Sequence, residues 1–254
     1  MYSADEELIE ALAARSGLVC LVGAGGKKTT LYRLAAAHPG RVGVTSSVFI
    51  PIFPDTLEAS RVIADEEHLA SAVTEAAAIA RVVAFASPST KHGRLGGVSP
   101  AFIHTIHQAA NFDVMLIKAD GARTSWIKAP EDDEPQIPEG ATTVIPIVSV
   151  RAIGEQLTEK IAHRIDRITE VTGARPGETI TSTHVARLLT SEKGSLKHTG
   201  KAIVVPLINM VDGPEQETQA RDAAEEALDL SPCFDRVVLS SMRRPRPLVA
   251  IIER

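Results

Sequence analysis

The sequence predicts an α/β fold of three layers, in which a mostly parallel sheet carries helices on both faces. Apolar and partly β-branched runs, typical of buried strands, alternate with helical stretches along the 254 residues. The first of these runs turns through a group of glycines directly into a helix. Polar residues follow the ends of several runs, and open parallel sheets bind their ligands at that edge. Together these observations favour a ligand-binding α/β protein.

The strand candidates are short apolar runs bounded by turn residues. They cover 18–22, 41–45, 82–86, 112–118, 142–148, 201–208 and 236–239, and 248–252 is expected to close the chain as an edge strand. The helix candidates between them are 4–15, the stretch that follows Thr30, 65–79, 100–110 and 214–230.

Residues 152–200 contain no strong strand candidate. Either Thr181 or Ser182 is placed to cap a helix there. We expect this segment to be a helical insertion or subdomain within a single α/β domain spanning 1–254. Its predicted helical pieces are 155–161, 163–171 and 183–189.

Composition and charge argue against several classes of protein. A net charge of −5 lacks the basic footprint of a nucleic-acid-binding protein. The two cysteines and the histidines show no spacing typical of a zinc site. No apolar run approaches the roughly 18 residues of a membrane span, and the polar, acidic start argues against a signal peptide. We therefore expect a cytoplasmic protein with no nucleic-acid or membrane partner.

The most informative stretch is 18–30, which reads LVCLVGAGGKKTT. Where a strand turns through glycines into a helix, the first helical N–H groups lack partners and, with the helix dipole, attract an anion. Glycines let the backbone approach that anion closely, and a lysine adds a mobile positive charge. We therefore expect phosphate binding by the small residues and the polar residues after them, which are Gly23, Ala24, Gly25, Gly26, Lys27, Lys28, Thr29 and Thr30.

The same stretch departs from the consensus phosphate loop G-x-x-x-x-G-K-[ST] in both possible registers. With Lys27 as the loop lysine, Leu21 replaces the first glycine and Lys28 replaces the hydroxyl residue. With Lys28 as the loop lysine, Thr29 matches, but Val22 and Lys27 occupy the glycine positions. An ordinary tight turn would also use glycines, although it needs neither lysines nor threonines. Both lysines are therefore candidates for neutralising phosphate charge in catalysis.

Asp120 directly follows the apolar run FDVMLIK and Ala119. An aspartate at the tip of a strand, downstream of a phosphate loop, holds Mg²⁺ in nucleotide-hydrolysing proteins of this architecture. A simple Asp-Gly turn would also place an aspartate there. With a phosphate loop nearby, we favour Asp120 as a catalytic and metal-binding residue, with the hydroxyl of Thr29 as a second metal ligand.

Several segments resemble the YqeC family, which is described as an accessory protein of selenium-dependent molybdenum hydroxylases. The segments are, in order, VGAGGKKTT, KADGAR, KAP, EPQIP, HR, TG and LINMVD, and they cover about residues 17–242. The resemblance implies a P-loop nucleotide hydrolase fold and a role in maturing a selenium- and molybdenum-containing enzyme. It also implies the hydroxylase apoenzyme or its cofactor as a partner. Two departures concern the site, since Lys118 stands where the family usually has an acid and Lys28 separates the Gly-Lys pair from the hydroxyl residue.

The segment 209–212, NMVD, also resembles the base-recognition motif of GTPases. A carboxylate accepts hydrogen bonds from N1 and N2 of guanine, whereas adenine offers an acceptor at N1, so a mismatch leaves buried polar groups unpaired. Met210 stands where the motif has a lysine, and the serines 240–241 follow the next strand. A strand-ending turn would also use Asn and Asp. We expect Asn209 and Asp212 to contact the base, with GTP slightly favoured over ATP.

Three functions remain open at this point. The first is an Mg²⁺-dependent nucleoside triphosphate hydrolase that serves as an accessory protein. The second is a kinase or nucleotidyltransferase whose acceptor is held by the basic loop Lys91 to Arg94 and by Arg123. The third is a non-hydrolysing chaperone that binds a nucleotide, or a cofactor by its phosphate. The first predicts phosphate release with Mg²⁺, the second predicts turnover only with an acceptor, and the third predicts binding without turnover.

Overall fold

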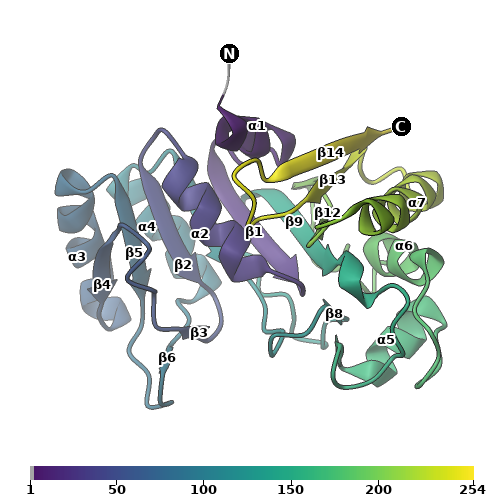
Figure 1. Ribbon diagram of the computed structural model, residues 1–254. Helices are drawn as coiled ribbons and strands as arrows, with labels where there is room; N and C mark the ends of the chain where they lie inside the picture. The colour runs from purple at the N-terminus through teal and green to yellow at the C-terminus, as the bar shows by residue number, and fades with distance from the viewer. Residues whose placement is uncertain (1–2) are drawn as a thin grey trace.

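The computed structural model describes residues 3–254 and confirms the three-layer α/β fold (Figure 1). Its central sheet contains ten strands. They are β1 (Gly17–Gly23), β2 (Val42–Ser46), β4 (Ser60–Ile63), β5 (Val82–Ala86), β7 (Val114–Lys118), β9 (Ala141–Ser149), β11 (Ile203–Val204), β12 (Leu207–Asn209), β13 (Arg236–Ser240) and β14 (Leu248–Glu253).

The sheet is parallel except at one edge. Its order is β14-β13-β12-β9-β1-β7-β2-β5-β4, with β11 also paired to β9. Only the pairing of β13 with β14 is antiparallel. The glycine-ending strand β1 therefore lies in the middle of the sheet, directly beside β7, and their carboxyl ends meet at the same edge.

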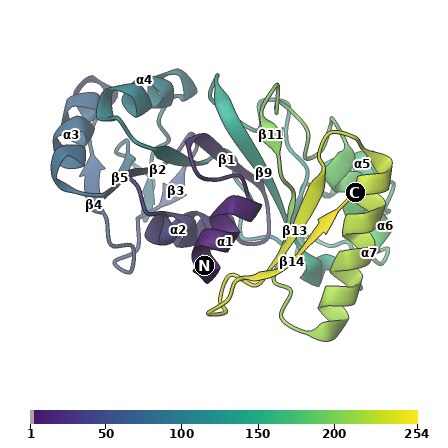
Figure 2. The ribbon, with the colours of Figure 1, turned by 90° about the horizontal axis from the view of Figure 1, so that it is seen from above.

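Alternating side chains of β1 contribute to two of the three core clusters, as the two-residue period of a strand requires. Val19 and Leu21 are fully buried in the cluster that includes α1 (Ala4–Ala11) and α2 (Lys27–Ala37). Leu18 and Cys20 are buried in the opposite cluster with α3 (Glu66–Ile79) and α4 (Pro100–Ala110). Figure 2 shows α1 and α2 on one face of the sheet and α3 and α4 on the other.

A third cluster joins the rest of the sheet to α5 (Ile165–Thr172), α6 (Ser182–Thr190) and α7 (Pro214–Leu230). Of the two residues predicted to cap α6, Thr181 is the cap, and its side chain accepts a hydrogen bond from the amide of His184. These helices continue the core of the sheet, because Val148 and Val237 belong to the same cluster.

Two predictions about secondary structure are wrong. Residues 155–161 form turns rather than a helix, and Gln156 pairs with Thr179 in an isolated bridge. The predicted strand 201–208 is divided into β11 and β12. The interruption falls at Pro206, which has no N–H to donate to a neighbouring strand.

Two small pairs of strands outside the central sheet were not predicted, one antiparallel and one parallel. β3 (Ile50–Pro51) pairs with β6 (Arg94–Leu95), and β8 (Ile127–Lys128) pairs with β10 (Ala162–His163). Figure 1 shows β3 and β6 on one side of the lower end of β1, and β8 and α5 on the other side. Each pair is too short to produce a periodic pattern in the sequence. The edge strand β4 was also missed, because its residues alternate between half-buried and exposed.

Within residues 3–254, none of the helices has both the length and the apolar character that crossing a bilayer requires.

Candidate functional site

The turn between β1 and α2 depends on glycine. The backbone of Gly25 has a φ of 91° and that of Gly26 a φ of 123°, which side chains rarely tolerate. A β-carbon on Gly25 would collide with the amide of Ser149. Nδ2 of Asn209, at the end of β12, donates to the carbonyl of Gly25 at 2.8 Å. The glycines are therefore needed for the close packing of the turn itself.

The protein already uses most of the N–H groups of this turn. The amide of Gly23 donates to Oδ2 of Asp120 at 2.9 Å. The amides of Ala24 and Gly25 donate to main-chain carbonyls at 2.8 and 3.0 Å. The N–H groups in the first turn of α2 have no intrahelical acceptor, as at any helix start. The part of the turn that can receive an anion is therefore the start of α2.

A cavity of about 690 Å³ opens at the start of α2. It lies at the carboxyl ends of β1 and β7, where parallel sheets bind ligands. Its wall contains the aromatic side chains of Phe49 and Trp126. Basic side chains outnumber acidic ones around it: the basic ones are Lys27, Lys28, Arg94, Lys118, Arg123, His163 and Arg164, and the acidic ones are Asp133 and Glu134. The cavity suits a ligand that is both anionic and partly apolar.

The two lysines of the turn have different surroundings. Lys27 is only 5% exposed, and its Nζ lies 2.8 Å from Oδ1 of Asp120 and also donates to the carbonyl of Gly23. Burial lowers the pKa of Lys27, while the nearby Asp120 carboxylate acts in the opposite direction. Lys28 is half-buried, lines the cavity and makes no hydrogen bond or ion pair with any part of the described chain. Lys28 is thus the cation that is free to meet a ligand.

The two threonines after them also differ. Thr29 is exposed and lines the cavity. Thr30 is buried, and its hydroxyl donates to the carbonyl of Gly26 at 3.2 Å within the helix. Of the two hydroxyl groups, only that of Thr29 faces the space that a ligand would fill.

Asp120 fits a metal role only when phosphate is present. Its carboxylate is 2% exposed and is held by two ammonium groups, Lys27 at 2.8 Å and Lys128 at 2.9 Å. Both oxygens are therefore occupied, Oδ1 by Lys27 and Oδ2 by Lys128 and the amide of Gly23, so that a metal would have to displace Lys27. Residues 3–254 hold no group of three or more His, Cys, Asp or Glu that could bind a metal. Mg²⁺ usually takes one or two carboxylates and completes its shell with phosphate and water, which this donor set allows.

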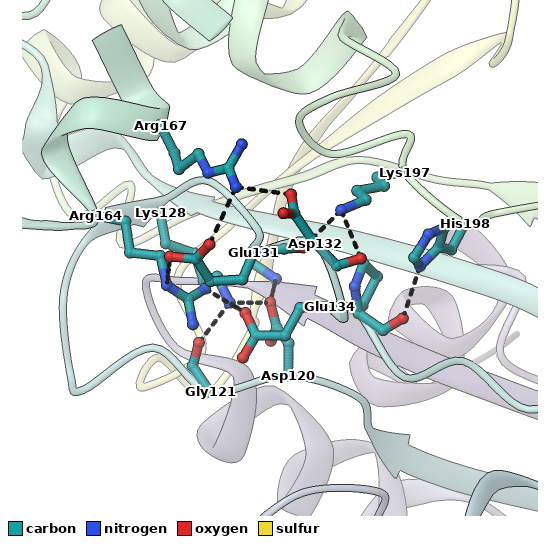
Figure 3. A network of polar contacts seen from close by, with 12 residues as sticks. Asp120, Gly121, Lys128, Glu131, Asp132, Glu134, Arg164, Arg167, Lys197 and His198 are labelled. Carbon is teal, nitrogen blue, oxygen red and sulfur yellow. Dashed lines mark hydrogen bonds and ion pairs between the residues drawn. The ribbon is translucent and has the colours of Figure 1, made fainter. Parts of the chain in front are cut away.

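Figure 3 shows a network of charges behind Asp120. Lys128 is 3% exposed and bridges Asp120 to Glu134, with an Nζ–Oε2 distance of 2.6 Å to the glutamate. Lys128 also donates to the carbonyl of Gly121 at 2.6 Å. Glu134 is held in turn by the guanidinium of Arg164, which precedes α5. The network therefore connects the end of β7 to the start of α5.

Glu134 is ionised over the whole neutral range. Burial raises the pKa of its carboxyl, but hydrogen bonds and charge from Arg164 and Lys128 outweigh it and bring the pKa down to about 2. The carboxylate compensates the buried ammonium of Lys128, which would otherwise be costly to hold away from water.

Lys118 is a second buried amine at the cavity. It ends β7, is 6% exposed, and its Nζ donates to the carbonyl of Phe49 at 2.9 Å. Burial lowers its pKa to about 7, and the positive charges of Lys27 and Lys128 contribute to the same direction. Near neutral pH, Lys118 therefore exchanges readily between its charged and uncharged forms.

The residues expected to read a base lie at the end of β12. Asn209 donates through Nδ2 to the turn between β1 and α2 and accepts from the hydroxyl of Ser240 at 3.0 Å. The carboxylate of Asp212 accepts from Ser241 at 2.6 Å and pairs with Arg151 at 2.7 Å. The hydrogen bond from Ser241 lowers the pKa of Asp212. Asp212 does not line the cavity, whereas Met210 does.

The structure brings Lys27, Lys28, Thr29 and Asp120 to one place and puts Asp212 beyond its rim. Sequence reasoning assigned no role to Lys128, Glu134 or Arg164. One signal was visible, because the acidic segment 131–138 is long for a structureless connection. Lys128 and Arg164 are far apart in the sequence, so their shared contact with Glu134 could not be predicted from local pattern.

The sheet order, the glycine turn and the cationic cavity define a three-layer α/β protein with a P-loop-like arrangement. The chain belongs to the YqeC family: the family model described as YqeC protein matches residues 19–166. YqeC of Escherichia coli (strain K12) is 29% identical over 191 residues, which are 72% of this chain and 72% of that protein. The matched range contains the turn, Asp120 and its network, and it ends before Asn209.

Proposed function

We propose that this protein binds a nucleoside triphosphate in the cavity at the start of α2 and hydrolyses it with Mg²⁺. The observation that carries the proposal is the position of Lys28, a cation with no acceptor in the described chain, beside the unpaired N–H groups of a helix start. Backbone donors and a lysine at a helix N-terminus are what a phosphate chain requires. The aromatic wall of Phe49 and Trp126 suits the nucleoside.

In this proposal Lys27, Lys28 and Asp120 are the catalytic residues. Lys28 and the first amides of α2 hold the phosphates, and Lys27 shifts its ammonium from Asp120 towards them. Asp120 and Thr29 are the residues that would hold Mg²⁺, which supplies positive charge against the β- and γ-phosphates when bound. Lys128 stays on Asp120 and keeps that carboxylate in place.

We propose guanine as the base, with GTP favoured over ATP. The support is the resemblance of 209–212 to a base-recognition motif and the orientation of the Asp212 carboxylate by the hydroxyl of Ser241. Because Asp212 lies outside the cavity lining, the base would have to extend past Met210 to reach it. Guanine would have to displace Arg151, whose side chain is 44% exposed. An ion pair so close to solvent contributes only about 0–1 kcal/mol to stability. Replacing Arg151 by guanine as the partner of Asp212 would therefore cost little free energy.

The proposal extends to the protein's role in the cell. Membership in the YqeC family supports a role as an accessory protein that helps to mature a selenium-dependent molybdenum hydroxylase or its cofactor, in the cytoplasm. The hydroxylase apoenzyme or its molybdenum cofactor would then be the partner, and nucleotide hydrolysis would switch the loops around the cavity between ordered and loose states.

The test is a binding and turnover screen on the full chain. Thermal shift and phosphate release are measured with GTP and ATP, with and without Mg²⁺. We expect Mg²⁺-dependent stabilisation and slow phosphate release, both lost in Lys28→Met. The matched control is Arg243→Gln, an exposed cation outside the cavity. Binding without turnover under all conditions would favour the non-hydrolysing chaperone instead.

A transferase is the second candidate, and one observation favours it. Arg94 and Arg123, expected from the sequence to hold an acceptor, both line the cavity. Lys91 does not; its ammonium lies 3.7 Å from the centre of the Phe49 ring. Turnover that begins only when an acceptor is added would select this function.

A further inference from the structure

The wall formed by β3 and β6 carries cationic groups that the proposed triphosphate site does not use. Lys118 donates to the carbonyl of Phe49, the residue before β3. Within the β3–β6 pair, Pro51 lies opposite Arg94. Both cations thus lie next to the segment 49–51, one through a hydrogen bond and the other through strand pairing, and both line the cavity. Figure 1 shows β3 and β6 on the opposite side of the lower end of β1 from β8 and α5.

Neither cation has a negative partner in the described chain. The side chain of Arg94 makes no hydrogen bond or ion pair with residues 3–254. An ammonium group has three donors, and Lys118 uses one of them on a carbonyl. Asp120 and Glu134, the acids that act on Lys118, are already shared with Lys27, Lys128 and Arg164. A buried amine with spare donors and no partner of its own is a site that lacks an anion.

The wall is also fixed in position. The amide of Gly96 donates to the carbonyl of Ser87 at 2.8 Å, and that of Val98 donates to Ser46 at 2.9 Å. A β-carbon on Gly97 would lie 2.5 Å from the backbone of Ser47, so the loop approaches the end of β2 closely. Arg94 is therefore carried on a segment whose place is set by the sheet, and a ligand would meet a prepared surface.

We propose that Lys118 and Arg94 form a second oxyanion subsite, which holds the phosphate or carboxylate group of a small second ligand. The subsite rests on the proposed function only in that a triphosphate would occupy the other side of the same cavity. Its residues come from the end of β7 and from β6, whereas the proposed triphosphate site uses residues of α2.

Calorimetry with inorganic phosphate tests the subsite directly. Phosphate is titrated at fixed pH into the full chain saturated with Mg²⁺ and a non-hydrolysable triphosphate analogue. We expect measurable binding in the wild type. Loss of a charge-assisted hydrogen bond should weaken phosphate affinity roughly tenfold in Lys118→Met and in Arg94→Gln.

Lys118→Arg separates a binding role from a structural one. Arginine keeps a positive charge with hydrogen-bond donors at this position, so this variant should keep phosphate affinity. Arg243→Gln, outside the cavity, should keep it as well. Phosphate affinity that is the same in Lys118→Met, Arg94→Gln and the wild type would overturn the subsite, as would the absence of phosphate binding.

A last arm distinguishes this proposal from the proposed function. If no triphosphate binds, phosphate is titrated into the free chain instead. Dependence of its affinity on Lys118 and Arg94, but not on Lys28, keeps the second subsite and rejects the triphosphate site. Dependence on Lys28 alone, with one-for-one competition by the triphosphate analogue, rejects the second subsite and keeps the first.

Discussion

Nζ of Lys27 lies 2.8 Å from Oδ1 of Asp120, and the two side chains are 5% and 2% exposed. The pair joins the first turn of α2 to the end of β7, two elements that the sheet order brings together because β7 lies beside β1. Lys128 contacts the other carboxylate oxygen at 2.9 Å. Asp120 thus contacts two buried ammonium groups, of which Lys128 is also paired with Glu134, and each proposed role for Asp120 requires Lys27 to leave.

We expect Lys27→Met and Lys28→Met to have different consequences. Lys27→Met removes one partner of a buried ion pair and should lower the free energy of unfolding by about 3 kcal/mol. Lys28→Met removes a half-buried cation that has no partner in the described chain, and it should change the free energy of unfolding by less than about 0.5 kcal/mol. Urea unfolding measures both. Equal losses of stability in the two variants would contradict the assignment of Lys27 as the structural partner of Asp120.

Lys118 should make the stability of the protein depend on pH above neutrality. Its pKa is about 7 in the folded chain against 10.5 in the unfolded chain, so between these values the unfolded chain binds more protons. The free energy of unfolding should then rise with pH across this window, by on the order of 5 kcal/mol. Below pH 7 both states are protonated and the effect is constant.

The variant Lys118→Met has no amine to titrate, so we expect the slope between pH 7 and 10 to disappear. It should also be more stable than the wild type at pH 6, where the wild type keeps a charge in a buried position. Urea unfolding at several pH values measures both effects. A wild-type curve that is flat from pH 7 to 10 would show that Lys118 is charged throughout.

The sequence predicted the parts of the fold that follow from local pattern. β5 and α4 have the predicted bounds, 82–86 and 100–110, because an apolar run or an amphipathic stretch is flanked there by clear breakers. β3 and β6, of two residues each, have no local pattern. They exist because the loops that contain them pack against the end of β2.

The site was predicted in the same uneven way. The glycines and Lys28 are adjacent in sequence, so their chemistry could be read directly. The different burial of Lys27 and Lys28 could not be read, since it depends on which side of α2 faces β7. The role of Glu134 was equally hidden, because Lys128 and Arg164 meet it only after α5 packs beside β8.

Asp212→Asn tests the base. An amide presents a donor where guanine N1 also presents one, so the preference for GTP over ATP should disappear and affinity for xanthosine triphosphate should rise. Competition binding with the three nucleotides measures the change. Arg151→Gln is the matched control, because it frees the carboxylate of Asp212 and should leave the GTP preference intact or increase it. An unchanged preference in Asp212→Asn would remove the guanine assignment.

Glu134→Gln tests the network behind Asp120. The variant leaves Lys128 without its second carboxylate and should lower the free energy of unfolding at pH 7 by about 3 kcal/mol. The matched control is Asp132→Asn, which removes a carboxylate that is 88% exposed and pairs with Arg167; the change there should be under about 1 kcal/mol.

The same carboxylate should govern part of the acid stability. The pKa of Glu134 is about 2 in the folded chain and 4.5 in the unfolded chain, so its contribution is complete above pH 4.5 and is lost as the pH falls towards 2. As the pH falls from 4.5 to 2, the free energy of unfolding should therefore decrease less in Glu134→Gln than in the wild type. At pH 7 the variant should have the lower free energy of unfolding. Parallel curves for the two proteins over that range would mean that Glu134 is not the carboxylate that holds Lys128 and Arg164 together.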